Sequence, residues 1–132
     1  MSRDLIQRYF DAFNTGDAEG MLALLTDDVE HHVNQGSIRH GKAAFAEFLA
    51  EMDRAYAERV EGLVILMGDD GARAAAEFTI HGTYKATQEG LPLAAGQTYV
   101  LPVGTFFTLR DGKIARVTTY YNMADWLRQV GA

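Results

Sequence analysis

The 132-residue sequence contains no cysteine, which excludes disulfide bonds and thiol chemistry and makes a reducing, cytoplasmic environment the expected one. No apolar run approaches the roughly 20 residues that a membrane-spanning helix needs. The N-terminus also lacks the basic and then apolar pattern of a signal peptide. Basic residues are few and unclustered, and the net charge is −6. A nucleic-acid partner is therefore not expected, because phosphate neutralisation dominates such affinities.

What remains is the composition of an ordinary globular protein, with 48% hydrophobic and 23% charged residues. The length suits one domain over residues 1–132, because it allows a substantial core but not two. Repeats, linkers and low-complexity tracts are absent from the sequence.

The N-terminal third predicts two helices. Apolar residues recur at helical spacing from Leu5 to Phe13, and Asn14-Thr15-Gly16 is expected to end this helix. Asp17 is suited to cap a second helix. That helix would bury Met21, Leu22, Leu24 and Leu25. A turn at residues 26–28 would follow.

The next segment predicts a polar strand over residues 29–33, which contains His31 and His32 and is followed by Asn34 and Gln35. Imidazole and amide groups that follow two apolar helices suggest a small polar cluster at the mouth of an apolar container. This arrangement is typical of a small-molecule pocket.

The remaining sequence predicts a third helix and then a series of strands. The helix starts after Gly41 and runs to about Glu58, with a buried face of Phe45, Phe48, Leu49, Met52 and Tyr56. Strands are expected over 63–67, 72–84, 98–109 and 113–122, the last two joined by an Asp-Gly turn. Residues 85–97 form a long connection that could act as a lid. Residues 124–129 form a last helical turn that could close one end.

The strand over 72–84 alternates between an apolar and a polar face. Ala74, Ala76, Phe78 and Ile80 share one face, and Arg73, Glu77, Thr79 and His81 share the other. The order of helices first and long antiparallel strands afterwards predicts an α+β fold, in which a strongly curved antiparallel sheet wraps the N-terminal helices.

Five pieces of the sequence, in their order and spacing, resemble one superfamily over essentially the whole chain. They are RYFDAFNTGD, LLTDDVEHHVNQG, RHGKAAFAEFL, EFTIHGTY and RDGKIARVTTYYN. The superfamily comprises ketosteroid isomerases, SnoaL-like polyketide cyclases and nuclear transport factor 2, and the SnoaL-like, ketosteroid-isomerase-related subgroup is the most similar. The resemblance implies the cone-shaped, cystatin-like fold. It does not settle the chemistry, because this fold hosts enzymes and binding proteins alike.

The resemblance carries over only part of the isomerase machinery, which consists of an Asp base, a Tyr and a protonated Asp. Tyr9 lies where the family has its oxyanion-binding Tyr, and the alternative is that it is only a core aromatic of the first helix. The base position falls on His32 or on Val33, depending on where a one-residue gap is placed. The second Asp falls on Thr105 or on Gly104. Since two of the three groups are replaced, the resemblance argues against standard steroid isomerase activity.

His31 is the base proposed in its place. If the gap puts Val33 at the base position, strand alternation makes His31 the inward side chain beside it. A histidine titrates near pH 6.5 and can accept a proton at neutral pH. The alternative is a histidine that only braces the bend beneath the helices. Asn34 and Gln35 could bind a carbonyl or hydroxyl group.

The last strand offers Thr119 and Tyr121 on one face, beside Thr105 on the preceding strand. Related epoxide hydrolases use acidic residues in this region, so the neutral pair argues against that activity. The expected apolar lining is Phe13, Phe48, Phe78, Ile80, Phe107 and Tyr121, with Trp126 near the base.

No metal or cofactor is expected, because the four histidines do not show the spacing of a zinc site. The predicted function is a cofactor-independent isomerase or cyclase that abstracts a proton next to a carbonyl of a hydrophobic substrate. His31 would be the base and Tyr9 the donor to the enolate. The alternative is a non-catalytic module that binds a hydrophobic small molecule. We also expect a homodimer, with the half-polar outer face of the sheet covered by a second copy.

Overall fold

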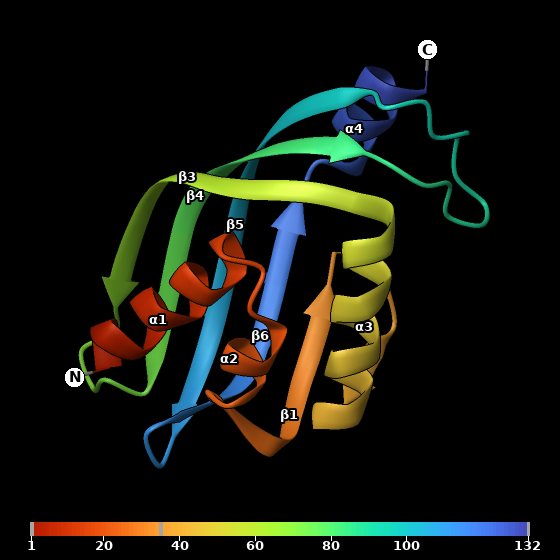
Figure 1. The fold of residues 1–132 in the computed structure, drawn as a ribbon. Coiled ribbons are helices and arrows are strands. Elements are labelled where there is room, and N and C mark those ends of the chain that lie inside the picture. The colour runs from red at the N-terminus through yellow and green to blue at the C-terminus, as the bar shows by residue number, and fades with distance from the viewer. Residues whose placement is uncertain (1, 35, 132) are drawn as a thin grey trace.

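The structure, a computed structural model, describes residues 2–34 and 36–131 and shows helices packed on one face of a curved sheet (Figure 1). The strands lie in the order β2-β1-β6-β5-β4-β3. The elements are α1 (Ser2–Asn14), α2 (Ala18–Leu22), β1 (Leu25–Val33), β2 (Ile38–His40), α3 (Lys42–Ala55), β3 (Tyr56–Met67), β4 (Arg73–Tyr84), β5 (Thr98–Arg110), β6 (Lys113–Tyr121) and α4 (Met123–Val130). This confirms the predicted α+β class.

The first helix and the strand over 73–84 pack as their apolar patterns predict. In α1, the stripe of Leu5, Ile6, Tyr9 and Phe10 is buried. Asp17 caps α2, where its side chain accepts a hydrogen bond from the backbone N–H of Gly20. Along β4, buried and exposed side chains alternate, with Phe78 and Ile80 in the core. The concave face of the sheet therefore supplies one wall of the core and the helices supply the other.

One strand pairing differs from the expected antiparallel sheet. β1 runs parallel to β6, with His31 opposite Val117 and Val33 opposite Thr119. A hairpin forces antiparallel pairing only between strands that it connects directly. Because β2 and α3 follow β1 and carry the chain away, no such constraint acts on β1 and β6.

The second helix is shorter than predicted, and the predicted turn is part of a strand. α2 ends at Leu22, so Leu24 lies outside it and Leu25 is the first residue of β1. Residues 26–28 lie within β1. The backbone explains the difference, because the N–H of Ile114 bonds to the carbonyl of Leu24 and draws this segment into the sheet.

The third helix is also shorter than predicted. α3 ends at Ala55, and β3 begins at Tyr56 rather than at residue 63. The segment from Tyr56 to Glu61 pairs residue by residue with β4, and a register shift near Gly62 (φ 66°) divides β3 into two parts. Ala, Glu and Arg favour helices, but the ladder of hydrogen bonds with β4 outweighs this local preference. The short strand β2 was not predicted.

The last helix and the connection 85–97 were also predicted. α4 runs from Met123 to Val130, and the Asn122 side chain caps it by accepting from the N–H of Asp125 at 3.0 Å. It lies at one end of the sheet, near the connection 85–97 (Figure 1).

Within residues 2–34 and 36–131, no helix is both long and apolar enough to cross a membrane.

Candidate functional site

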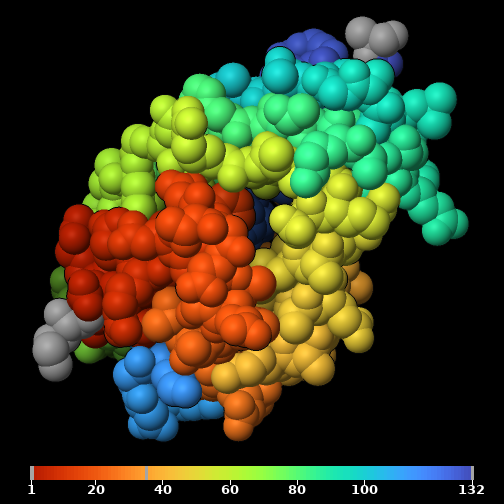
Figure 2. All heavy atoms as spheres, viewed as in Figure 1, coloured from red at the N-terminus to blue at the C-terminus, as the bar shows by residue number. Residues whose placement is uncertain are grey.

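A cavity of about 220 Å³ lies between the concave face of the sheet and the helices. Its opening is visible between the red-orange segment of α1 and α2 and the yellow α3, with dark blue atoms of the C-terminal part of the chain deep inside (Figure 2). The lining is mostly aromatic and aliphatic. Ten of the predicted residues line it: Tyr9, Phe13, His31, Phe48, Phe78, Ile80, Thr105, Thr119, Tyr121 and Trp126.

His31 lies on β1 and reaches the cavity from the inward face of that strand. Only 4% of its surface is exposed. Its ring stacks on Phe45 with centroids 4.3 Å apart, and the ring of Phe48 meets it edge-on at 4.5 Å. His32 points the other way, and its Nε2 lies 3.2 Å from a Glu30 carboxylate oxygen. Strand alternation thus makes His31 the cavity histidine of the pair.

The surroundings of His31 keep its ring neutral. Burial lowers the pKa of His31 to about 4, and the positive charge of Arg39 and then His32 add to this. Arg39 is held nearby, with its guanidinium carbon 5.1 Å from the centre of the Phe48 ring. Nδ1 is buried and has no hydrogen-bond partner in the described part of the chain. A neutral imidazole can accept a proton, although its low pKa makes it a weak base.

Tyr9 faces the same cavity from α1. Its ring packs edge-on against Phe10 at 5.3 Å and Phe107 at 5.5 Å. Burial raises the pKa of Tyr9 well above its ordinary value, so the phenol stays protonated. No hydrogen bond within residues 2–34 and 36–131 contributes to this shift, so the phenol is available as a donor in the cavity.

Three polar groups of the last two strands line the cavity floor. The hydroxyl oxygens of Thr105 and Thr119 are 3.4 Å apart on the neighbouring strands β5 and β6. Tyr121 donates its hydroxyl to the sulfur of Met123 at 3.6 Å. Burial and, secondarily, the charge of Glu58 raise the pKa of Tyr121. All three groups are therefore neutral hydrogen-bonding groups.

Three predicted residues do not line the cavity or cannot be placed. Phe107 is fully buried behind Tyr9, where it packs in the core. Asn34 adopts a positive φ of 46°, and its side-chain oxygen accepts from the N–H of Tyr121 at 3.3 Å. Both side chains thus serve packing or backbone pairing instead of the cavity. Gln35 lies outside the described residues.

The cavity also contains residues that the sequence reasoning missed, above all Glu58. The expected helix extended to this position, whereas in β3 the side chains of Tyr56, Glu58 and Val60 all line the cavity. The hydroxyl of Tyr99 donates to the Glu58 carboxylate at 2.5 Å. Burial raises the pKa of Glu58 above its ordinary value, an effect that this hydrogen bond partly offsets. The alternating pattern Tyr-x-Glu-x-Val in the sequence could have indicated a strand with these three side chains on one face.

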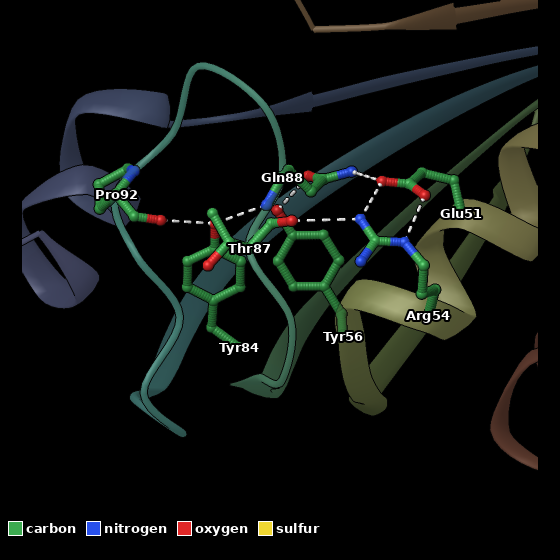
Figure 3. A network of polar contacts seen from close by, with 7 residues as sticks. All are labelled: Glu51, Arg54, Tyr56, Tyr84, Thr87, Gln88 and Pro92. Atoms are coloured by element: carbon green, nitrogen blue, oxygen red, sulfur yellow. Dashed lines mark hydrogen bonds and ion pairs between the residues drawn. The ribbon is translucent and has the colours of Figure 1, made fainter.

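A polar network fastens the connection 85–97 to the rim of the cavity (Figure 3). Gln88 accepts from the hydroxyl of Tyr56 at 2.5 Å and donates to the carboxylate of Glu51 at 2.9 Å. Arg54 binds the same carboxylate at 2.8 Å and the backbone carbonyl of Thr87 at 3.2 Å. Gln88 and Leu91 from this connection line the cavity, so the segment forms part of its wall.

The side chains of the site are poorly suited to bind a metal ion. Within residues 2–34 and 36–131, no three His, Cys, Asp or Glu side chains lie close enough together to hold one. His31 and Glu58 are the cavity's imidazole and carboxylate, and the other polar side-chain groups are hydroxyls, an amide and the indole N–H of Trp126. The arrangement is suited to proton transfer and hydrogen bonding to a mostly apolar ligand.

Comparison with known proteins agrees with this architecture. The model of the SnoaL-like domain family matches residues 6–117. Two solved structures, both described as candidate polyketide cyclases, match with TM-scores of 0.97. The one from Silicibacter sp. TM1040 is 59% identical and covers 99% of this chain and 96% of its own. The one from Pseudomonas putida KT2440 is 55% identical and covers 98% of both chains.

More distant structures share the fold alone. TerC, co-crystallised with polyporic acid, is 20% identical with a TM-score of 0.81 and covers 99% of this chain and 98% of its own. No curated protein matches the chain significantly. From the family match over residues 6–117 and the two highly similar structures, the chain belongs to the SnoaL-like domain family.

Proposed function

We propose that the protein is a cofactor-independent isomerase or cyclase that abstracts a proton next to a carbonyl of an apolar substrate. One observation carries the proposal: a neutral imidazole and a protonated phenol, His31 and Tyr9, line the same apolar cavity. Proton abstraction from carbon needs a base together with a donor that stabilises the enolate oxygen. The names of the two most similar structures described above, as candidate polyketide cyclases, support a reaction of this class.

The proposed roles follow from the chemistry of each side chain. His31 accepts the proton from the carbon next to the carbonyl, and the electron pair left behind delocalises onto the carbonyl oxygen. Tyr9 donates a hydrogen bond to that oxygen as its charge develops. Thr105, Thr119 and Tyr121 hold the polar edge of the substrate, and the aromatic walls hold its apolar part.

A second function, a non-catalytic binding module for a hydrophobic small molecule, is favoured by one feature. The ring of His31 is packed against Phe45 and Phe48, and a pKa of about 4 makes it a weak base. A binding protein needs only the apolar cavity and a few hydrogen bonds. The two functions differ in whether carbon–hydrogen bonds of a bound ketone are broken.

Hydrogen–deuterium exchange of a ketone tests the proposal directly. The probe is 2-tetralone in D₂O, and NMR follows loss of the signals next to its carbonyl. The proposal expects exchange faster than in buffer, and loss of that acceleration in His31→Ala. His32→Ala is the matched control, because His32 points away from the cavity. Probe binding without accelerated exchange would favour the binding module.

A further inference from the structure

Glu58 and Tyr99 form a hydrogen-bonded pair at the wall of the cavity. Glu58 on β3, Gly82 on β4 and Tyr99 on β5 lie opposite one another in consecutive strands. A Cβ atom at Gly82 would lie 2.3 Å from the ring of Tyr99. The missing side chain therefore lets the tyrosine ring cross β4 and place its hydroxyl 2.5 Å from the Glu58 carboxylate.

Aromatic rings surround this carboxyl group. Tyr56, Tyr99 and Trp126 lie with their ring centroids 6.1–6.3 Å apart, and Tyr84 stacks on Tyr56 at 5.4 Å. The titratable groups that face Glu58 are phenols, namely Tyr56 on its own strand, Tyr99 on β5 and Tyr121 on β6. Burial raises the pKa of each of these phenols. No cation from the described residues contributes to the pKa of Glu58, so its environment favours the protonated acid.

Isomerisation and cyclisation both require a second proton transfer. Removing a proton next to a carbonyl gives an enolate. The reaction ends only when a proton is delivered elsewhere, to the γ-carbon of a dienolate or to the alkoxide oxygen formed in an aldol-type closure. β1 and β3 are separated by β6, β5 and β4 in the sheet. Because the sheet curves around the cavity, His31 and Glu58 line it from different strands and can address different atoms of one substrate.

We propose that Glu58 is the general acid of this site, which delivers a proton to the substrate atom remote from the one that His31 deprotonates. This inference rests on the proposed function. His31 takes the proton from carbon, and Glu58 gives its carboxyl proton to the γ-carbon or alkoxide oxygen. The product leaves with its proton count unchanged. The imidazolium and the carboxylate then return to their starting states by proton exchange with water through the cavity mouth.

Tyr99 is a positioning residue in this proposal. Its hydroxyl bonds one oxygen of Glu58 and leaves the other to face the substrate. It also stabilises the carboxylate that remains after proton delivery, since a hydrogen bond to the charged form favours that form.

A β,γ-unsaturated ketone separates the two proton transfers. The probe is cyclohex-3-enone in D₂O, for which NMR reports deuterium uptake at the carbon next to the carbonyl and conversion to cyclohex-2-enone. We expect Glu58→Gln to slow conversion about 100-fold and to retain α-carbon exchange. His31→Ala should lose both. Glu77→Gln, an exposed carboxyl on β4, is the matched control.

The outcomes separate the two proposals. Conversion at the wild-type rate in Glu58→Gln, with exchange retained, overturns the role of Glu58 alone. Loss of both reactions in a folded Glu58→Gln protein overturns the division of roles between Glu58 and His31. Wild-type protein that accelerates neither reaction overturns the proposed function, and the role of Glu58 with it.

A second measurement does not depend on turnover. Carbon-13 NMR of carboxyl-labelled glutamate should show one group, absent in Glu58→Gln, that titrates above the ordinary range. Tyr99→Phe should move that titration further upward, because it removes a hydrogen bond to the charged form. An ordinary titration for Glu58, or no shift in Tyr99→Phe, would overturn the inference.

Discussion

The hydroxyl of Tyr84 accepts a hydrogen bond from the backbone N–H of Gln88 at 3.0 Å, within the segment that follows β4. The same hydroxyl donates to the carbonyl of Pro92 at 2.7 Å. One buried side chain thus fixes both the start and the middle of the connection 85–97. This connection supplies part of the cavity wall, so the tyrosine links the core of the sheet to the site.

Replacing Tyr84 with Phe should loosen this connection without disturbing the aromatic core. The N–H of Gln88 and the carbonyl of Pro92 would lose their partner, which we expect to cost about 1–3 kcal/mol of unfolding free energy. Amide hydrogen exchange of Gln88 should also become faster. Chemical denaturation and exchange measurements check both effects. Tyr120→Phe, which keeps the ring on the outer face of the sheet and removes only a hydroxyl remote from this connection, should change neither.

The histidine in the cavity should make stability depend on pH. The pKa of His31 is about 4 in the folded protein and near 6.5 in the unfolded chain. As pH falls below 6.5, the unfolded chain binds a proton that the folded protein does not. Stability should therefore decrease between pH 6.5 and 4, by up to about 3 kcal/mol, and the loss should be constant below that window.

The comparison that isolates this effect is wild type against His31→Gln, because glutamine does not titrate. As pH falls from 6.5 to 4, the unfolding free energy of the wild type should decrease relative to that of His31→Gln. Parallel curves for wild type and His31→Gln would contradict the low pKa.

Adding one methyl group at Gly82 should break the pair of Glu58 and Tyr99. A Cβ there would overlap the Tyr99 ring at 2.3 Å, so the ring must move or the strand must shift. We expect Gly82→Ala to cost about 1–3 kcal/mol of stability. Gly104→Ala on β5, where a Cβ would meet nothing closer than 4.0 Å, is the matched control. Equal melting temperatures for the two variants would argue against the close approach.

The outer face of the sheet leads us to expect a homodimer. Exposed apolar side chains gather on its strands: Val64, Leu66, Val100, Phe106 and Tyr120. The rings of Phe106 and Tyr120 lie 5.9 Å apart on neighbouring strands and form a contiguous apolar area that a two-fold partner can cover. Sedimentation equilibrium should give twice 14.6 kDa, and Phe106→Lys should weaken the association. A stable monomer at micromolar concentration would refute this expectation.

Standard 3-oxo-Δ5-steroid isomerisation should be absent or very slow. The position of the acidic oxyanion donor falls on Thr105 or on Gly104, and the position of the base falls on His32 or on Val33, so neither position carries a carboxyl group. Loss of one oxyanion donor alone typically lowers the rate by about 10²–10³. A spectrophotometric assay of the conjugated product checks this. Conversion at the pace of true steroid isomerases would show that the residues were matched wrongly to that family.

Much of the fold could be predicted because local patterns and tertiary packing agree. The stripe of α1 and the alternation of β4 each mark a face that is buried in the structure. Alternation also places His31 and His32 on opposite faces of their strand, and the structure shows that His31 is the buried one. In such segments the local preference and the global fold favour the same conformation.

The carboxyl group of the site could not be found in the same way, because its segment has conflicting signals. Residues 56–61 contain Ala, Glu and Arg, which favour a helix, and they follow a true helix without Gly or Pro. Their strand conformation depends on pairing with β4, more than 15 residues later in the chain. Asn34 was misassigned for a related reason, since its backbone role depends on the distant Tyr121.

The parallel pairing of β1 with β6 also constrains the order in which parts of the protein can fold. His31 lies beside Val117, a residue more than 80 positions further along the chain. During synthesis, β1 therefore emerges long before the strand that supports it exists. Contacts of such large sequence separation form slowly. The base of the site should be among the last groups to reach its final position, and a nascent chain that lacks β6 should have no working cavity, because Thr119 and Tyr121 of the cavity wall belong to that strand.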